Sequence, residues 1–187
     1  LIPLLCESSV NKSFETLKKS DRGEYEISDI HSYLLKNNYK VGYKHITGYW
    51  KDTGKPEDLL VANRLLLDEL SLESFRKDGT MGENVRVDGK VHLGAGTTVK
   101  NAKLNGPVFI GENCTIENCA LGPNVTVGAG SIIKKASISN SILLNKCDID
   151  GELKIDGSII GSNAAIIKNN TSEFQRMIVG DNTLIEI

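Results

Sequence analysis

The sequence predicts two parts, a small α+β segment and, after it, a parallel β-helix. Eight of the ten aromatic residues of this 187-residue chain lie within residues 1–80, and only Phe109 and Phe174 follow them. Beyond residue 85 the aliphatic residues recur with a spacing that is neither helical nor strictly alternating, and glycines recur with them. Composition and periodicity therefore change together, which indicates a change of architecture.

The β-helix prediction rests on a repeat of seventeen residues. The aliphatic positions advance in steps of 6, 6 and 5 residues, three times in succession. They are Val87, Leu93, Val99, Leu104, Ile110, Ile116, Leu121, Val127, Ile133 and Ile138. Three short strands per coil, each turning one aliphatic side chain inward, predict a prism of triangular section. Its coils stack about 4.8 Å apart, and each coil needs neighbours to complete its hydrogen bonds.

The pattern becomes irregular in its second half. After Ile138 the steps are 6, 5, 6, 5 and 6 residues, which places Leu144 inward and predicts a distorted coil near Cys147. The last stretch, EFQRMIVGDNTLIEI, leaves the pattern and is expected to cap the open end or to run back along a face. The expected organisation is a first part over residues 1–77, a linker over 78–84, the β-helix over 85–170 and a capping tail over 171–187.

The first part alternates helical and strand signals. We expect a short helix over residues 13–20, a helix with Ser28 as N-cap to about Asn37–Asn38, a strand or hairpin over residues 39–50, and a helix from Pro56 to about Leu72. Proline is favoured as a first helical residue, and the acidic residues that follow Pro56 suit the positive end of the helix dipole.

Charge and hydropathy exclude several partners. Lys and Arg number 22 against 24 Asp and Glu, with a net charge of -2 and no basic cluster, so we expect no nucleic acid partner and no anionic membrane surface. The longest apolar runs are too short to span a bilayer, and we expect a cytoplasmic protein. Because the chain opens on Leu1, we also expect it to be part of a longer one.

The four cysteines, Cys6, Cys114, Cys119 and Cys147, have no CxxC spacing and no accompanying histidines at zinc-ligand spacing. We therefore expect free, buried thiols and no zinc site.

One carboxylate stands out in the first part. Asp52 lies in GYWKDTGKPEDLL, residues 48–60, at a predicted turn between a strand and a helix. Ligand-facing groups of α/β folds lie at such turns. The alternative is a turn residue that accepts hydrogen bonds from nearby backbone, which is common for Asp in this position.

Two motifs resemble a known family. RGEYEISD at residues 22–29 and GYWKDTGKPEDLLVANRLLLD at 48–68 are similar to the closing part of the sugar-1-phosphate nucleotidylyltransferase catalytic domain. The units VHLGAG, VFIGEN and VTVGAG resemble hexapeptide repeats, which form left-handed β-helices. With the ending RMIVGDNTLIEI, the chain is most similar to the long-chain glucose-1-phosphate thymidylyltransferase branch of that family. The resemblance implies the remnant of a nucleotidyltransferase α/β domain followed by a left-handed parallel β-helix.

The resemblance also implies a reaction and its site. Family members join a nucleoside triphosphate to a sugar 1-phosphate and release pyrophosphate; in this branch dTTP and glucose 1-phosphate give dTDP-glucose. Mg²⁺ is bound by two aspartates, and the second maps onto Asp52. Trp50, Glu26 and Asp29 are implied as weaker candidates for the substrate pocket. Ser28 replaces the threonine of the family's run and keeps a hydroxyl.

The family's glycine-rich GGxGTRLxPxT loop does not occur in these 187 residues. Its phosphate-binding lysines and its first metal aspartate belong to that same missing half, so we expect no catalytic residue here and no activity from the chain alone. We further expect a homo-oligomer.

Two alternatives remain from the repeat itself. One is a coenzyme-A-dependent acyltransferase with His92 as general base, and the other is a non-catalytic oligomerisation module. A solvated strand histidine is the simpler interpretation of His92, which alternation turns outward.

Overall fold

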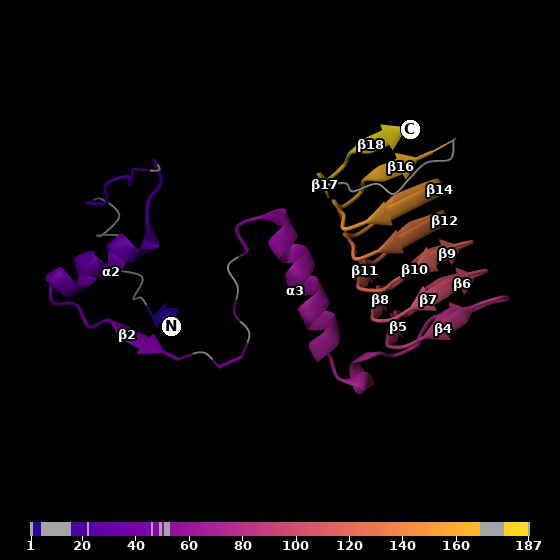
Figure 1. Ribbon diagram of the computed structural model, residues 1–187, viewed down its shortest axis with the longest axis horizontal. Coiled ribbons are helices and arrows are strands. Elements are labelled where there is room, and N and C mark those ends of the chain that lie inside the picture. The colour runs from indigo at the N-terminus through magenta and orange to yellow at the C-terminus, as the bar shows by residue number, and fades with distance from the viewer. Residues whose placement is uncertain are drawn as a thin grey trace. The chain divides into compact units, whose positions relative to one another are not determined.

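The computed structural model describes residues 2–4, 16–21, 23–45, 47–48, 50, 53–168 and 178–186. The chain forms two compact units, residues 1–50 and 51–187 (Figure 1). The helix that begins at Pro56 therefore lies in the same unit as the β-helix, whereas the sequence pattern grouped it with residues 1–77.

The first unit contains a helix and a pair of short strands. Strand β1 (Ile2–Leu4) pairs antiparallel with β2 (Gly42–Lys44). Helix α2 (Ile27–Lys36) buries Ile30 and Leu34, which are spaced four residues apart and so share one face.

The predicted N-cap of α2 is wrong by two positions. Glu26, with an extended backbone, is the N-cap, and the Asp29 amide donates to its carbonyl oxygen at 3.0 Å. Ser28 lies inside the first turn, where its helical backbone prevents it from capping. The helix ends before Asn37, as predicted.

The described part of the predicted helix over residues 13–20 is not helical. Thr16 lies in a turn and residues 17–20 have no regular structure. Ser20 instead closes a turn in which its amide donates to the Glu24 carbonyl and its carbonyl accepts from the Gly23 amide, both at 2.8 Å. Glycine at a φ of 78° permits this turn and competes with helix formation.

Helix α3 (Pro56–Glu69) begins where the sequence predicts. The Asp58 carboxylate accepts a hydrogen bond from the Lys55 amide at 3.2 Å, which satisfies a backbone donor at the helix start. The helix ends at Glu69, earlier than expected, because Leu70 has an extended backbone. A short 3-10 turn, η1 (Leu72–Ser74), leads into the β-helix.

Three stacks of parallel strands form the β-helix (Figure 1). The first stack holds β4 (Arg86–Asp88), β7 (Lys103–Asn105) and β10 (Ala120–Leu121). The second holds β3 (Thr80–Met81), β6 (Thr98–Lys100), β9 (Thr115–Glu117), β16 (Ala165–Ile167) and β18 (Leu184–Glu186). The third holds β5 (Val91–Leu93), β8 (Val108–Ile110), β11 (Val125–Val127), β13 (Ile142–Leu143), β15 (Ile159–Ile160) and β17 (Ile178–Val179). Strands β12 (Ile132–Ser139) and β14 (Asp148–Asp156) run through both the second and the first stack.

The strand register confirms the seventeen-residue period. Val87 pairs with Leu104, Leu104 with Leu121, Leu121 with Ile138 and Ile138 with Ile155. Nine of the ten predicted inward side chains are at most 1% exposed. The tenth, Val87, packs against the same core and is partly buried.

The irregular half of the coil differs from the prediction at one step. Leu143 is 1% exposed and pairs with Ile160, whereas Leu144 is 41% exposed. The step after Ile138 is therefore five residues, one shorter than expected. The next step, from Leu143 to the buried Ile149, is six residues, one longer than expected, so the coil recovers the lost residue at the corner that holds Cys147. A bulge between β12 and β14, where Lys135 lies opposite both Gly151 and Glu152, then provides the six-residue step to Ile155.

The described part of the C-terminal tail continues the strand stacks. β17 pairs in parallel with β15, and β18 pairs in parallel with β16. Val179 lies opposite Ile160 and Ile185 lies opposite Ile166, each nineteen residues later. These strands cover the last complete coil with a further rung instead of running back along a face.

Candidate functional site

Three of the four predicted site residues, Glu26, Asp29 and Trp50, belong to the first unit. Asp52, the predicted metal ligand, is outside the described residues. Trp50 is 65% exposed, which leaves its indole free of a packed core. Glu26 and Asp29 lie at the start of α2, and the Glu26 carboxylate accepts a hydrogen bond from the Ser20 hydroxyl at 3.0 Å.

The structure brings Glu26 and Asp29 together at one helix end. Both carboxylates lie near the positive end of the α2 dipole, where negative charge stabilises a helix. The described residues hold no group of three or more His, Cys, Asp or Glu side chains arranged for a metal ion.

The contacts of His92 are structural. The ring stacks on Phe109 with centroids 4.2 Å apart and an interplanar angle of 8°. Its Nδ1 atom accepts a hydrogen bond from the Arg76 amide at 3.2 Å. A general base needs a nitrogen lone pair directed at the substrate, but the lone pair of Nδ1 already accepts the hydrogen bond from the Arg76 amide. These contacts favour the simpler interpretation of His92.

Helix α3 is held on the third stack of strands, a contact that sequence reasoning missed. The Thr126 hydroxyl donates to the Asn63 side-chain oxygen at 2.6 Å, and the Lys90 ammonium donates to the carbonyl oxygens of Asp68 and Leu70 at 3.0 and 3.2 Å. Leu67 is buried at 3% exposure. Helix α3 is thus fixed to the β-helix by polar contacts at its middle and its C-terminal end.

A groove of about 810 Å³ lies on the β-helix, along the corner between the second and first stacks. Its lining repeats with the coil period, because each coil contributes a corner residue and the residues that follow it. They are Asn84, Arg86, Asn101, Ala102, Lys103, Asn118, Cys119, Ala120, Lys135, Ala136, Ser137, Glu152, Leu153 and Lys154. The sequence signal was a column at seventeen-residue intervals with Arg86, Lys103 and Lys154 at its basic positions, but inward aliphatic positions alone do not show that the outer face is hollow.

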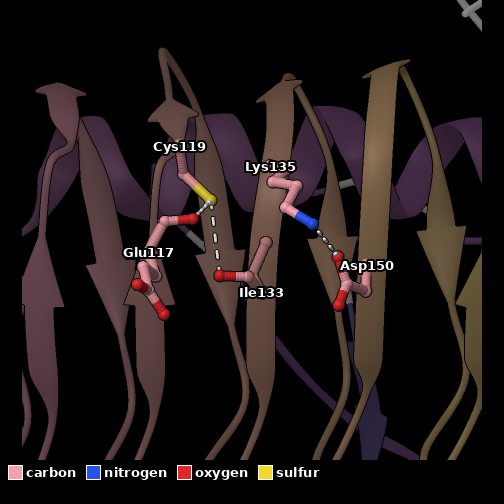
Figure 2. Close-up of polar contacts among 5 residues, drawn as sticks. All are labelled: Glu117, Cys119, Ile133, Lys135 and Asp150. Carbon is pink, nitrogen blue, oxygen red and sulfur yellow. Dashed lines mark hydrogen bonds and ion pairs between the residues drawn. The ribbon is translucent and has the colours of Figure 1, made fainter.

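Cys119 lies beneath this groove as a buried thiol. Figure 2 shows its Sγ atom donating to the carbonyl oxygens of Glu117 and Ile133, at 3.0 and 3.3 Å. Burial raises the pKa of the Cys119 thiol. Cys114 and Cys147 are likewise free and buried, as the sequence predicts, and Cys6 lies outside the described residues. A neutral buried thiol is a poor nucleophile, so these cysteines act as core side chains.

The thiol of Cys147 should make the β-helix less stable at alkaline pH. Burial raises its pKa from 9.0 to about 11, and Sγ donates to the Leu144 and Gly161 carbonyl oxygens, both at 3.2 Å. Because the unfolded thiol loses its proton first, this stabilisation is complete below about pH 9 and is lost as the pH rises towards 11.

We expect wild type to lose about 2 kcal/mol more unfolding free energy than Cys147→Ala between about pH 8 and pH 10.5. Urea unfolding of both proteins at the two pH values measures the difference. Equal losses in the two proteins would show that Cys147 does not titrate differently on folding.

Two family models match the chain. Residues 6–69 match the family described as "Nucleotidyl transferase", and residues 104–186 match the family described as "GMPPB C-terminal domain". The chain is homologous to sugar-1-phosphate nucleotidyltransferases. The first match ends at the end of α3, and the second lies within the β-helix, so both parts of the chain have counterparts in this group.

Individual relatives agree with these matches. A glucose-1-phosphate thymidylyltransferase of Streptomyces antibioticus is 33% identical over 180 residues, 96% of this chain and 50% of that protein. A low-salt glycan biosynthesis nucleotidyltransferase, Agl11, of Haloferax volcanii is 44% identical over 85 residues, 46% of this chain and 23% of the relative. A bifunctional protein GlmU of Methanococcus aeolicus is 39% identical over 93 residues, 50% of this chain and 22% of the relative. The chain spans half or less of the length of each of these three relatives.

None of the helices in the described ranges has the length and hydropathy needed to cross a membrane.

Proposed function

We propose that this chain is the C-terminal part of an enzyme that forms dTDP-glucose and pyrophosphate from dTTP and glucose 1-phosphate. The observation that carries the proposal is the match of 180 residues to a glucose-1-phosphate thymidylyltransferase, which runs through the α3 segment and the β-helix in the same order. The matches to other nucleotidyltransferases cover about half of the chain or less, so they support the reaction class more than the sugar nucleotide.

In the proposed reaction an oxygen of the sugar 1-phosphate attacks the α-phosphorus of dTTP. A new P–O bond forms, the bond to the β-phosphate oxygen breaks, and pyrophosphate leaves with its electron pair. Mg²⁺ would supply positive charge between the attacking and leaving oxygens. Asp52 is proposed to hold that ion as one of two carboxylate ligands, since hard cations prefer carboxylate oxygens.

The remaining site residues are proposed for the substrate pocket. The exposed indole of Trp50, two residues before Asp52, offers a flat apolar wall on which a sugar ring can pack. Glu26 and Asp29 offer carboxylates at one helix end, and the Ser20 hydroxyl orients the first of them. Because no nucleotide-binding loop occurs in these 187 residues, the chain alone is proposed to be inactive.

A coupled assay of pyrophosphate release tests this function. The full-length protein is expected to release pyrophosphate and to form dTDP-glucose when given dTTP, glucose 1-phosphate and Mg²⁺. The 187-residue chain under the same conditions is expected to release none. Reactions without glucose 1-phosphate measure background hydrolysis. Product formation from another nucleotide or sugar phosphate alone would overturn the substrate assignment, and no product from any pair would overturn the reaction class.

A further inference from the structure

We propose that the groove on the β-helix binds a phosphorylated small molecule with an uncharged body, such as a nucleotide or a sugar phosphate. The site is formed entirely by residues 84–154, and the inference goes beyond nucleotidyl transfer. Its volume of about 810 Å³ lies within the range of about 300–1,000 Å³ that is common for small-molecule sites.

The outward residues of the first stack shape the groove. In register from one coil to the next they are Arg86, Lys103, Ala120, Ser137 and Lys154. The two short side chains in the middle leave a hollow, and long cationic side chains lie on both sides of it. Lys103 and Lys154 are three strand spacings apart, or roughly 14 Å along the stack. A ligand in the hollow therefore lies between two positively charged ends.

The corner residues form the second wall. Asn84, Asn101 and Asn118 all have left-handed backbone conformations, with φ between 47° and 55°, which asparagine tolerates better than most residues. The Asn84 amide donates to the Asn101 side-chain oxygen at 3.0 Å. Lys135 takes the next corner, so the asparagine row ends in a further cation. Amide groups and an ammonium on one wall suit a ligand that is rich in oxygen acceptors.

The charge of the lining favours an anion. Four cationic side chains, from Arg86, Lys103, Lys135 and Lys154, face one carboxylate, from Glu152, although the whole chain carries a net charge of -2. Lys135 lies 3.7 Å from the Asp150 carboxylate, and the two side chains are 60% and 40% exposed (Figure 2). Exposed pairs of this kind contribute little, so a multiply charged phosphate can compete for the lysine.

The floor explains why the ligand should also have an uncharged part. Ala102, Ala136 and Leu153 line the groove from below but are almost fully buried, whereas Ala120 in the hollow is partly exposed. Inorganic phosphate would leave the Ala120 methyl group and the aliphatic stems of Lys103 and Lys154 in contact with water, whereas a base or sugar ring would cover them. The phosphate groups of such a ligand would contact the lysines at one end of the groove, and its ring would lie on the apolar floor.

NMR titration of the ¹⁵N-labelled 187-residue chain tests the proposal. The probes are a nucleoside 5′-diphosphate, a hexose 1-phosphate, pyrophosphate, and the uncharged nucleoside and hexose. We expect saturable amide shifts at Ala120 and Ser137 with one of the two organic phosphates, and at least about tenfold weaker binding of its uncharged counterpart. Tighter binding of the nucleoside 5′-diphosphate would identify the uncharged part of the ligand as a nucleoside, and tighter binding of the hexose 1-phosphate would identify it as a sugar. Equal binding of the uncharged molecule, or no saturable shift with any organic phosphate, would overturn the proposal.

Three variants distinguish the contribution of charge to binding from that of the space in the hollow, and thermal unfolding shows whether each variant is folded. Lys103→Gln and Lys154→Gln are each expected to weaken binding about tenfold, because a charged hydrogen bond is lost. Ala120→Phe, which fills the hollow without changing charge, is expected to abolish saturable binding. Lys146→Gln is the matched control, since this exposed lysine lies at another corner and should bind as wild type does. Thermal unfolding of each variant checks its fold, and unchanged affinity in a folded Ala120→Phe protein would contradict the assigned groove.

Discussion

Replacing Leu143 with alanine is expected to lower the free energy of unfolding of the β-helix by about 2–5 kcal/mol, whereas Leu144→Ala should cost less than about 1 kcal/mol. The two leucines are neighbours, but Leu143 is 1% exposed and Leu144 is 41% exposed. Leu143 lies between Val127 and Ile160 in the third stack, so its removal leaves a cavity that neither rung can fill.

Urea unfolding of the two variants and wild type, followed by circular dichroism, measures this difference. The pair forms its own control, because the two substitutions remove the same atoms from adjacent positions. The six-residue step predicted from the sequence requires the opposite result, with Leu144→Ala the more harmful change. A larger loss in Leu144→Ala would therefore show that the coil follows the longer step.

Replacing Asp52 with alanine in the full-length protein is expected to lower kcat for Mg²⁺-dependent dTDP-glucose formation by at least about 100-fold. Loss of residues that merely orient metal ligands typically costs 10- to 100-fold, and a direct ligand should cost no less. Without the carboxylate, the ion that balances charge around the α-phosphorus is held by one protein ligand fewer. Raising the Mg²⁺ concentration should recover part of the lost rate if metal affinity is the cause.

Asp21→Ala serves as the control for this experiment, because Asp21 is an exposed carboxylate in the same part of the chain. We expect it to keep near-normal turnover, and we expect both variants to unfold at the temperature of wild type. Near-normal turnover in Asp52→Ala would sink the metal assignment. A large drop in unfolding temperature would instead identify Asp52 as a turn residue that accepts backbone hydrogen bonds.

The β-helix could be predicted from sequence because its signal is local and repeated. Each coil must turn aliphatic side chains inward at fixed steps, so the repeat can be recognised even where one position departs from it. The prediction failed where two adjacent residues were equally suitable for the inward position. Leu143 and Leu144 have the same side chain, and only the rungs above and below decide which one is buried.

The start of α3 was predicted correctly and the start of α2 was not, again because only the second had two neighbouring candidates. Pro56 marks the start of α3 unambiguously, because its fixed φ suits a first helical turn and its missing amide costs nothing there. The start of α2 has both Glu26 and Ser28 within two residues, and serine is the better cap by preference alone. In the structure Glu26 is the N-cap, and its carbonyl oxygen accepts a hydrogen bond from the Asp29 amide.

The sequence by itself determined the seventeen-residue coil, the inward aliphatic column from Leu93 to Ile138, and the position of Asp52 in its motif. These follow from residue spacing and residue type, which a linear chain shows directly. Only the tertiary structure decided that α3 is held on the third stack through Asn63, and that small residues beside Lys103 leave a groove. Those features depend on side chains from different coils meeting in space, and coil spacing alone does not determine such contacts.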